Sequence, residues 1–384
     1  MIGKLTLVLC VLLLSLPANA QTETILYAFP GGDGNGWGPV SNLTSDGAGN
    51  FYGTTVFGGI PSEQGGYGTV YELSPNGSGG WTETALYDFC SVPNCTDGGN
   101  PFGPVIFDSK GNLYGTTYGA GAYGYGVVFE LSPVGTSWSE TVLHSFAGGA
   151  DGGFPECGLI FDPAGNLYGS TLNYYGLSGT IFELSPSGNG WINQVIFDLG
   201  PYSSAALNLA MDATGNIYGV LPGGVFELSP NGNGGWTQTM IYGFTGPQGQ
   251  KGPPVLDQAG NVYFTTKADG AHTLGAVYKV SPGKQGWTGK ILYSFKWGGK
   301  DGRYPLAGVA FDSIGNIYGT TSAGGEYKDG TVFELVAPVG KGKYKEKVLW
   351  SFNGTDGEDP QDSLILDSAG NLYGTAGIVF EITP

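Results

Sequence analysis

The sequence predicts an all-β protein built as a closed ring of repeated sheets, and three observations support this prediction. A motif G-N-[LIFV]-Y occurs seven times at intervals of 45 to 62 residues, and a period in this range is typical of propellers and solenoids. The segments around each copy are rich in β-branched and aromatic residues, which is the signature of strands. No stretch of residues 21–384 keeps a helical period over ten residues. The predicted fold is a seven-bladed β-propeller of four-stranded antiparallel blades. The seven motifs begin at Gly49, Gly111, Gly165, Gly215, Gly260, Gly315 and Gly370.

The third repeat shows the four strands of one blade. Its extended segments are residues 155–162 (PECGLIFD), 165–171 (GNLYGST), 179–184 (GTIFEL) and 192–199 (INQVIFDL). Each segment is bounded by Gly, Pro, Asn or Asp, the residues that form turns. Apolar residues run almost continuously through LIFD and IFEL, as expected when both faces of a sheet are covered by neighbouring sheets.

The two ends of the chain are predicted to complete one blade together. The third type of segment, typified by VFEL, occurs seven times. The fourth type occurs six times inside the repeats, and a seventh copy stands alone at residues 22–29 (TETILYAF). The last repeat stops at Pro384, one strand short. We therefore expect the N-terminal strand to close the last blade, which also removes the exposed edges of an open array.

Two kinds of repeated residue are assigned to structure. An Asp lies three residues before each Gly-Asn pair, where its short side chain can accept hydrogen bonds from the amides of the turn. Trp residues that open the fourth strand are interpreted as packing residues, as is Trp350. The Asp residues are Asp46, Asp108, Asp162, Asp212, Asp257, Asp312 and Asp367, and the Trp residues are Trp81, Trp138, Trp191, Trp236 and Trp287.

The first twenty residues are predicted to be a secretory signal peptide. Lys4 precedes an apolar run over residues 5–16, and a small-residue A-x-A site follows before Gln21. The apolar run is too short to span a bilayer, and no second run of about 20 apolar residues follows. We therefore expect residues 21–384 to form a single propeller domain that is secreted or periplasmic, without a membrane span and as a monomer.

Composition limits the classes of partner. The formal net charge is −17, so most of the surface is expected to repel a phosphate backbone, which argues against nucleic acid. A basic or neutral partner is easier to accommodate than an acidic one. The chain holds 72 Gly but only 12% charged residues, a balance typical of a loop-rich secreted β protein. No cofactor is expected.

Three cysteines follow the signal peptide. Cys90 and Cys95 bracket a four-residue loop, and in an oxidising compartment they are candidate disulfide partners. The closed loop is short, so the expected stabilisation is small. No histidine lies nearby, which makes a zinc site a poor interpretation. Cys157 is interpreted as a small buried hydrophobic residue.

The repeat unit resembles that of a known family. D-x-x-G-N-L-Y-G-T-T, a Gly-rich loop, G-T-V-F-E-L-S-P, a Gly-Trp turn, T-V-L-Y-S-F and G-G-x-D-G-x-x-P together are similar to the tandem repeat of the GloVer, or choice-of-anchor, group of secreted bacterial proteins. The fourth and fifth repeats lack D-G-x-x-P. The strand pattern is also similar to that of NHL-type propeller repeats. The resemblance implies a surface or secreted location and no particular activity.

Candidate ligand-binding residues lie in the variable loops. In a propeller, the loops between second and third strands and the connections to the next blade share one face, where ligands usually bind. Aromatic side chains in these loops suit the apolar face of a neutral sugar. An equal alternative is that these side chains pack the loops together. The Asp-Gly pairs Asp33, Asp97, Asp151, Asp301 and Asp356 are interpreted as turn formers. The candidate binding residues are Trp37, Tyr123, Tyr125, Tyr174, Tyr175, Trp297, Tyr304 and Tyr327.

Two residues are weak catalytic candidates. Arg303, the only arginine, could hold a carboxylate, and His272, one of two histidines, could act as an acid or base. A solvated loop charge explains each of them equally well. Two histidines are too few for a multi-histidine metal site, and no metal site is expected. The leading hypothesis is a non-catalytic binding or structural propeller with a glycan or extracellular protein as ligand. The alternative is a polysaccharide lyase or glycoside hydrolase with its site at the mouth of the central channel.

Overall fold

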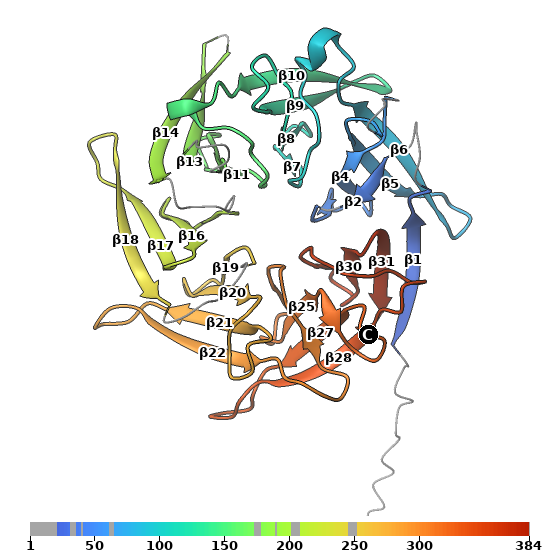
Figure 1. Cartoon of the computed structure of the whole chain (residues 1–384), viewed down its shortest axis with the longest axis vertical. Helices are drawn as coiled ribbons and strands as arrows, with labels where there is room; N and C mark the ends of the chain where they lie inside the picture. Colours follow the sequence, from blue (N-terminus) through green and yellow to red (C-terminus); the bar gives the residue numbers. More distant parts are fainter. Residues whose placement is uncertain are drawn as a thin grey trace, which may run out of the picture.

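The computed structural model describes residues 21–30, 36–39, 41–60, 65–172, 178–188, 190–200, 208–244 and 252–383. Within these ranges, seven small antiparallel sheets lie around a ring, each forming one blade (Figure 1). The predicted seven-bladed β-propeller is confirmed. The predicted signal peptide lies outside the described residues. None of the helices in the described ranges is long and apolar enough to cross a membrane.

The first four blades follow one another along the chain, each running outward from a short inner strand (Figure 1). Blade 1 holds β2 (Trp37–Pro39), β3 (Thr44–Ser45), β4 (Phe51–Phe57), β5 (Thr69–Pro75) and β6 (Trp81–Asp88). Blade 2 holds β7 (Ile106–Phe107), β8 (Leu113–Thr117), β9 (Val127–Val134) and β10 (Ser137–Ser145). Blade 3 holds β11 (Ile160–Phe161), β12 (Leu167–Ser170), β13 (Gly179–Ser187) and β14 (Gly190–Gly200). Blade 4 holds β15 (Ala210–Met211), β16 (Ile217–Leu221), β17 (Gly224–Pro230) and β18 (Trp236–Gly243).

The last three blades keep the same order. Blade 5 holds β19 (Val255–Leu256), β20 (Val262–Thr266), β21 (Ala276–Ser281) and β22 (Thr288–Ser294). Blade 6 holds β24 (Ala310–Phe311), β25 (Ile317–Thr321), β27 (Thr331–Val336) and β28 (Lys345–Ser351). Blade 7 holds β29 (Ile365–Leu366), β30 (Leu372–Thr375), β31 (Ile378–Thr383) and β1 (Thr22–Ala28). The loops add a small sheet of β23 (Gly302–Arg303) with β26 (Ala323–Gly324), and the 3-10 turns η1 (Pro93–Cys95) and η2 (Gly149–Asp151).

The ring is closed by the two ends of the chain, as predicted. β1 pairs antiparallel with β31, from Thr22 opposite Thr383 to Ala28 opposite Ile378. The N-terminal strand thus becomes the outer strand of blade 7 and lies against blade 1 (Figure 1). The hydrophobic cluster at this junction joins Leu26 and Val379 of blade 7 to Phe51 of blade 1. Closure therefore gives the last interface the same kind of core as the others.

The core is divided among the interfaces between blades. In the described part of the chain, each of the seven interfaces has its own cluster of buried apolar residues. At one of them, Phe146 from the end of blade 2 packs edge-on against Phe182 of blade 3 at 5.2 Å between ring centroids. A Cβ on Gly169 would lie 2.5 Å from the Phe182 ring. Glycine follows Leu-Tyr in the motif because this ring occupies the space of a side chain.

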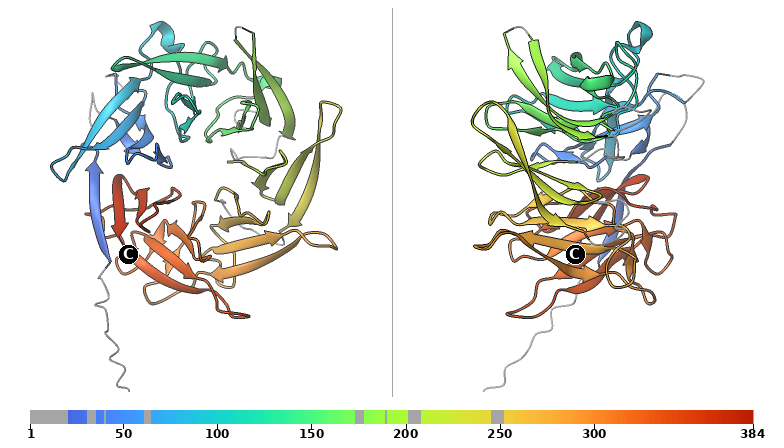
Figure 2. Two further views of the ribbon diagram at one scale, coloured as in Figure 1. Left: turned by 180° about the vertical axis from the view of Figure 1, so that it is seen from behind. Right: turned by 60° about the vertical axis from the view of Figure 1, so that its left-hand side comes forward.

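Antiparallel pairing places the connections alternately on two faces of the ring. We call turn face the one with the turns between first and second strands and the hairpins between third and fourth strands. The loop face carries the loops between second and third strands and the connectors to the next blade. Figure 2 shows the ring from behind and obliquely, with connections projecting on both sides.

The structural roles predicted for Asp and Trp are confirmed. In all seven turns, Oδ1 of the Asp accepts the backbone N–H groups two and four residues later, and Oδ2 accepts the Asn side-chain amide. In the turn of Asp212 these bonds come from Thr214 and Asn216, at 2.8 to 3.0 Å. The equivalent bonds in the other turns follow the same pattern. The repeated Trp side chains pack against the hydrophobic clusters; Trp191, for example, meets Tyr114 of the preceding blade.

Candidate functional site

On the loop face, connectors in the described part of the chain are tied by backbone hydrogen bonds to loops of the blades that they join. Between blades 1 and 2, the N–H of Asn100 donates to the carbonyl of Tyr67 at 2.6 Å, and the N–H of Tyr118 donates to the carbonyl of Asn100 at 3.0 Å. Phe154 and Tyr304 make the same kind of bridge at two other interfaces. All three bridging residues have a left-handed backbone, with φ between +56° and +60°. At these positions, therefore, backbone hydrogen bonds join neighbouring blades.

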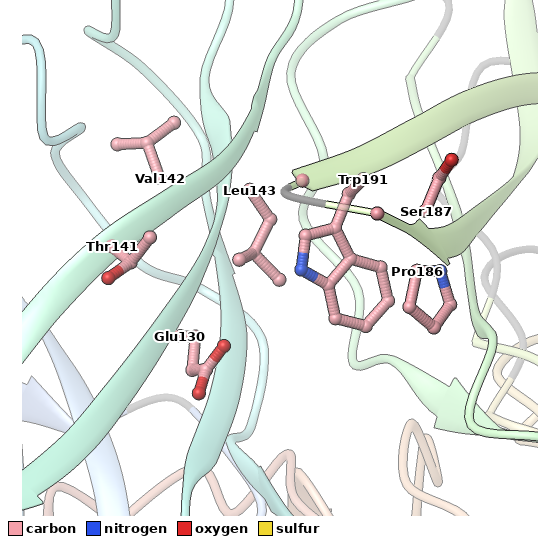
Figure 3. A pocket seen from close by; sticks show the side chains of 9 residues that line it. Glu130, Thr141, Val142, Leu143, Pro186, Ser187 and Trp191 are labelled. Atoms are coloured by element: carbon pink, nitrogen blue, oxygen red, sulfur yellow. The ribbon is translucent and has the colours of Figure 1, made fainter.

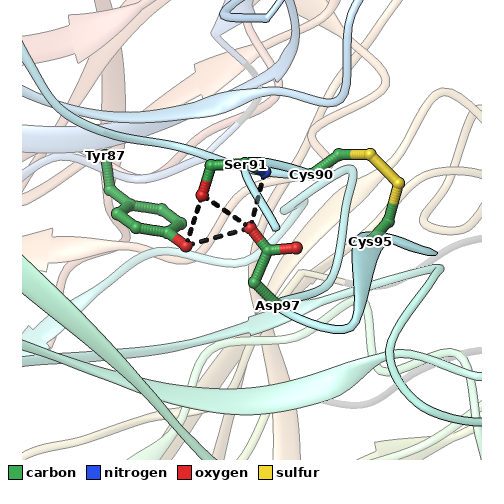
Figure 4. The surroundings of a disulfide bond; sticks show 5 residues. All are labelled: Tyr87, Cys90, Ser91, Cys95 and Asp97. Atoms are coloured by element: carbon green, nitrogen blue, oxygen red, sulfur yellow. Dashed lines mark hydrogen bonds between the residues drawn. A yellow bond between two sulfur atoms is a disulfide. The ribbon is translucent and has the colours of Figure 1, made fainter. Parts of the chain in front are cut away.

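The connector carboxylates are engaged by the protein itself. Oδ2 of Asp97 accepts the hydroxyl of Tyr87 at 2.9 Å and the N–H of Ser91 at 2.8 Å, beside the Cys90–Cys95 disulfide (Figure 4). The predicted disulfide is thus present, and Cys157 is buried as predicted. Burial raises the pKa of the Cys157 thiol to about 12. The equivalent carboxylates also accept bonds from their own blade or connector, as expected for turn formers; they are Asp151, Asp301 and Asp356. Asp33 lies outside the described residues.

One group of candidate residues lies together on blade 6. The connector from blade 5 and the loop between β25 and β27 meet where β23 pairs with β26. The guanidinium of Arg303 lies 5.1 Å from the centre of the Trp297 ring, a cation–π contact. Trp297 exposes 66% of its surface, and Tyr327 on the adjacent loop exposes 55%. Lys300 pairs with Glu326 between the two segments. We call this group the blade-6 platform, made of residues 296–304 and 322–330.

The other candidate aromatic residues have different surroundings. Tyr123 exposes 63% of its surface on blade 2. Trp37 exposes 37% and stacks on Phe57 with ring centroids 4.4 Å apart. Tyr125 is half-buried and packs edge-on against Phe154 at 5.3 Å. Tyr123 is therefore open to a ligand, whereas Trp37 and Tyr125 already pack against loop residues.

Three more candidates complete the set. Tyr304 is half-buried and packs against the hydrophobic cluster between blades 5 and 6. Tyr174 and Tyr175 lie outside the described residues.

The two histidines have separate surroundings. Nε2 of His144 lies 3.1 Å from Oδ2 of Asp151, within blade 2 and its connector. His272 is exposed on the loop of blade 5, and its carbonyl accepts the Thr273 hydroxyl at 2.6 Å. Arg303, the other weak catalytic candidate, stacks on Trp297 instead.

Small residues bring the inner ends of neighbouring blades together. The hydroxyl of Thr54 in blade 1 donates to the carbonyl of Gly103 in blade 2 at 3.1 Å, and Thr116 donates likewise to Cys157 of blade 3 at 3.0 Å. A Cβ on Gly103 would lie 2.6 Å from the Cys157 carbonyl group. We call the positions equivalent to Gly103 and Cys157 in the different blades the inner ring. Its described members are Ser41, Gly103, Cys157, Gly252, Ala307 and Asp362.

Asp362 is the one carboxyl group among the described members of the inner ring. Its Oδ2 accepts the hydroxyl of Thr375, and burial raises its pKa to about 7. Glycoside hydrolysis in its usual form needs a pair of carboxyl groups on either side of the scissile bond. The described members of the inner ring supply one such group and otherwise small side chains or backbone.

A hollow of about 450 Å³ lies at the outer rim, between blades 2 and 3 (Figure 3). Leu143 and Thr141 of β10 form one side, and Trp191 and Pro186 of blade 3 form the other. Glu130 is the one titratable residue that lines it, and its Oε1 accepts the Ser132 hydroxyl at 2.9 Å. None of the described candidate loop residues lines this hollow, which lies by the hairpin between β13 and β14.

Two features of the loop face were missed by sequence reasoning. The stacking of Arg303 on Trp297 joins two residues treated separately, although both lie in one connector. The other feature is a repeated polar position in the outer strand, held by Glu23, Glu140 and Glu346, which interacts electrostatically with the connector Asp of the preceding blade. Aligning the outer strands of the repeats places these glutamates at one position, so the sequence does contain a signal for the second feature.

The solved structures most relevant to the fold include two extracellular domains from B. thetaiotaomicron. For that of a one-component system, the TM-score is 0.58 at 14% identity, over 94% of this chain and 42% of the other. For the extracellular domain of a hybrid two-component system, the TM-score is 0.54 at 14% identity, over 90% of this chain and 39% of the other. A Bacteroides uniformis protein described as a putative 6-phosphogluconolactonase gives a TM-score of 0.53 at 12% identity, over 79% of this chain and 84% of the other. At these identities the likeness shows the fold alone, and this chain spans less than half of the first two domains.

No curated protein matches the sequence. The family model described as the Gloeobacter/Verrucomicrobia repeat matches residues 12–224 and again residues 221–384. These two matches cover nearly the whole chain and all the blade motifs. The chain therefore belongs to the Gloeobacter/Verrucomicrobia repeat family, as the GloVer-type resemblance implied.

Proposed function

We propose that this protein is an extracytoplasmic propeller that binds a glycan on its loop face and acts as a binding module. The observation that carries the proposal is the exposure of large aromatic side chains there, 66% for Trp297 and 63% for Tyr123. The expected signal peptide at residues 1–20 supports the location. The extracellular domains among the structural neighbours are compatible with it.

The chemistry of these side chains favours a sugar. A flat aromatic ring covers the apolar face of a pyranose, and neighbouring polar groups bind its hydroxyls. The blade-6 platform offers both, because Trp297 and Tyr327 lie among Lys, Arg and Glu side chains. Its backbone is fixed by the pairing of β23 with β26, which reduces the ordering entropy lost on binding.

Binding also fits the state of the carboxylates better than hydrolysis does. Asp97, Asp301 and Asp356 are buried and accept hydrogen bonds that hold their own connectors. A catalytic carboxylate must instead reach the reacting bond of the substrate. The exposed rings therefore provide the contacts that a ligand can use.

The test is a glycan array and a polysaccharide pull-down with residues 21–384, followed by product analysis of every glycan bound. Trp297→Ala and Tyr123→Ala are expected to reduce retention, because each removes an exposed ring. Ile314→Ala and Val339→Ala remove exposed apolar side chains from the turn face and serve as matched controls. Equal loss in all four variants, or no glycan bound, contradicts the proposal. Release of shorter or unsaturated sugars would show that the protein cleaves the glycan, and an enzymatic function would then replace the proposed binding module.

A further inference from the structure

The charge of this protein is strongly segregated around the ring. Thirteen of its fifteen Lys and Arg residues lie between residues 251 and 347, with only eight of its 32 Asp and Glu residues. This segment, essentially blades 5 and 6, has a formal charge of +5, and the rest of the chain has −22. The net charge of −17 therefore hides a basic sector, and the expectation of a basic or neutral partner does not hold for that sector.

Four of these cations gather on the blade-6 platform. They come from the connector and from the neighbouring loop, which β23 and β26 hold side by side. Of the acidic groups on the platform itself, Asp301 is buried and accepts the Tyr293 hydroxyl at 2.9 Å, and Glu326 pairs with Lys300. Exposed Asp359 lies beside the platform, because its N–H donates to the carbonyl of Asp329 at 2.9 Å. Asp329 is half-exposed. The four cations are Lys296, Lys300, Arg303 and Lys328.

We propose that the blade-6 platform binds an anionic polysaccharide through its sugar carboxylates, with Trp297 stacking on a uronate ring and Arg303 binding the carboxylate. This inference rests on the proposed glycan-binding function and adds its substrate class. Arg303 suits the role because a guanidinium forms paired hydrogen bonds with a carboxylate. Its stacking on Trp297 holds the guanidinium beside the ring on which the sugar lies. Lys296 and Lys328 add attraction for a polymer of regularly spaced charges.

The probes are polygalacturonate and the same polymer with its carboxylates fully methyl-esterified, bound to residues 21–384 at low and high salt. We expect binding of the charged form, weakened by salt. Arg303→Met keeps the aliphatic stem and should weaken this binding by roughly 10- to 100-fold. Lys341→Met removes one charge from the turn face of the same blade and should leave it unchanged.

The outcomes separate this inference from the proposed function. Equal binding of both polymers, lost in Trp297→Ala but not in Arg303→Met, keeps glycan binding and overturns the anionic specificity. Preference for a sulfated dextran over polygalacturonate overturns the assignment to carboxylates. Absence of binding to every glycan tested removes both proposals together.

A second inference rests on buried carboxyl groups at the interfaces between blades. In blade 3, the side-chain N–H of Asn193 donates to Oδ1 of Asp151, in the connector from blade 2, at 2.6 Å. Blades 2 and 6 place Glu140 and Glu346 at the position of Asn193. Each of them interacts electrostatically with the connector Asp of the preceding blade, Asp97 or Asp301.

The hydrogen bonding at these two interfaces is incomplete when all four groups are ionised. Oδ1 of Asp97 and Oε1 of Glu140 are buried without a donor, and so are Oδ1 of Asp301 and Oε1 of Glu346. Asp97 and Asp301 are only 1% and 8% exposed. Two unpaired carboxylates in such surroundings repel each other, and each lacks a hydrogen bond.

We infer that Glu140 and Glu346 each hold a proton at neutral pH and donate it to Asp97 and Asp301 across the blade interface, in the place of the Asn193 amide. Burial, and then the facing Asp, raises the pKa of Glu140 to about 8 and that of Glu346 to about 7. The groups that surround these pairs are consistent with sharing one proton. Tyr87 and Tyr293 donate to the Asp of each pair, and Lys296 alone opposes protonation, at Glu346.

The sign of the pH dependence follows. Both glutamates have a raised pKa in the folded state, so the stabilisation is complete below about 4.5, their ordinary value, and is lost as pH rises through about 7 to 8. Between these limits each glutamate increases the unfolding equilibrium constant by up to about tenfold per pH unit. These two interfaces therefore loosen in alkaline solution.

The test is chemical unfolding between pH 5 and 9 of the wild type and the double variant Glu140→Gln, Glu346→Gln. The amide donates without titrating, so the decline in stability toward pH 9 should be clearly shallower in the variant. Glu23 and Asp362, whose pKa values burial also raises to about 7, account for the decline that remains. Asn193→Glu should steepen the decline. An unchanged pH slope in the double variant overturns the inference, and so does rescue of the wild type at pH 9 by added Ca²⁺, which would indicate a cation in place of the proton. If the variant does not fold, infrared spectra of the wild type must show protonated carboxyl groups at pH 7 that disappear by pH 9; their absence overturns it equally.

Discussion

The turn face and the loop face of this ring are built from the same seven repeats but differ in how constant their side chains are from one repeat to the next. On the turn face, each first turn has an Asp that accepts two backbone amides and an Asn side chain, so the turns are nearly identical. On the loop face, four of the described connectors share a left-handed bridging residue, yet its side chain is Asn, Phe, Tyr or Asp. The side chains are constant where the chain must reverse tightly, and they vary where backbone hydrogen bonds make the bridge between blades.

The pKa values of the turn Asp residues and of the glutamates at the blade interfaces are shifted in opposite directions. Burial works to raise the pKa of Asp212, but hydrogen bonds from Thr214 and Asn216 outweigh it and lower the pKa. At the interfaces near the loop face, burial dominates and raises the pKa of Glu140. An exposed carboxylate surrounded by donors is stabilised as an anion, and a buried one that faces another carboxylate is stabilised with its proton.

The largest loss of stability is expected at the inner ring, where neighbouring blades approach closely between the two faces. Gly103→Ala places a Cβ 2.6 Å from the backbone of Cys157, so the interface between blades 2 and 3 must shift. We expect a loss of about 1–3 kcal/mol in the free energy of unfolding, measured by denaturant titration. Gly243→Ala, with nothing within 4 Å of the new Cβ, is the matched control. Equal stability of the two variants contradicts the close approach.

The second-largest effect tests whether the turn face contributes to stability without taking part in glycan binding. Asp212→Ala removes the acceptor of several hydrogen bonds in one turn, including that of the Tyr218 hydroxyl at 3.0 Å. We expect a loss of about 1–2 kcal/mol, because hydrogen bonds to a charged acceptor are among the stronger ones and this site is partly exposed.

The comparison for this prediction is Asp198→Ala, which removes an exposed carboxylate from the outer strand of blade 3. Glycan retention should be unchanged in both variants. Weaker retention in Asp212→Ala at a temperature where it is fully folded would show that the turn face takes part in binding.

A smaller difference in stability is expected between aromatic residues of the loop face that pack against other side chains and those whose rings are exposed. Tyr125→Ala should reduce stability by about 1 kcal/mol, because Tyr125 packs against Phe154. Tyr123→Ala should stay within about 0.5 kcal/mol of the wild type, because its ring is exposed. Thermal unfolding of both variants checks the difference. A larger loss for Tyr123→Ala would mean that its ring packs in solution and is not a free contact.

The smallest effect per group is expected in acid. Five of the turn Asp residues have a lowered pKa, so their contribution to stability is present above their ordinary value of 3.8 and is lost as pH falls through the lower folded values. Stability measured by denaturant titration should decline on acidification below about pH 4, in contrast to the alkaline decline expected from Glu140 and Glu346. Asp212→Asn should reduce the acid decline slightly; no reduction would mean that this carboxylate does not contribute through its charge.

Much of the fold was accessible from the sequence because each blade repeats local signals. The turn Asp, the Trp at the start of the fourth strand and the Cys90–Cys95 pair all act on residues nearby in the chain. The candidate site was accessible only in outline. Sequence placed Trp297 and Tyr304 in one connector, but the ring of Trp297 is exposed and that of Tyr304 packs against the interface between blades 5 and 6. Alternation along a strand reveals which residues are buried, whereas a loop has no period that would reveal it.

The sequence by itself determined the number of blades, the strands within each blade and the closure by residues 22–29, because these depend on repeated patterns and on counting strands. The tertiary structure alone decided that Arg303 lies over Trp297, that Gly103 must admit the backbone of Cys157, and that Glu140 interacts electrostatically with Asp97. The reason is physical. Strands and turns follow from interactions between neighbours in sequence, whereas these contacts depend on how closely two blades approach and in which direction their loops leave the sheet.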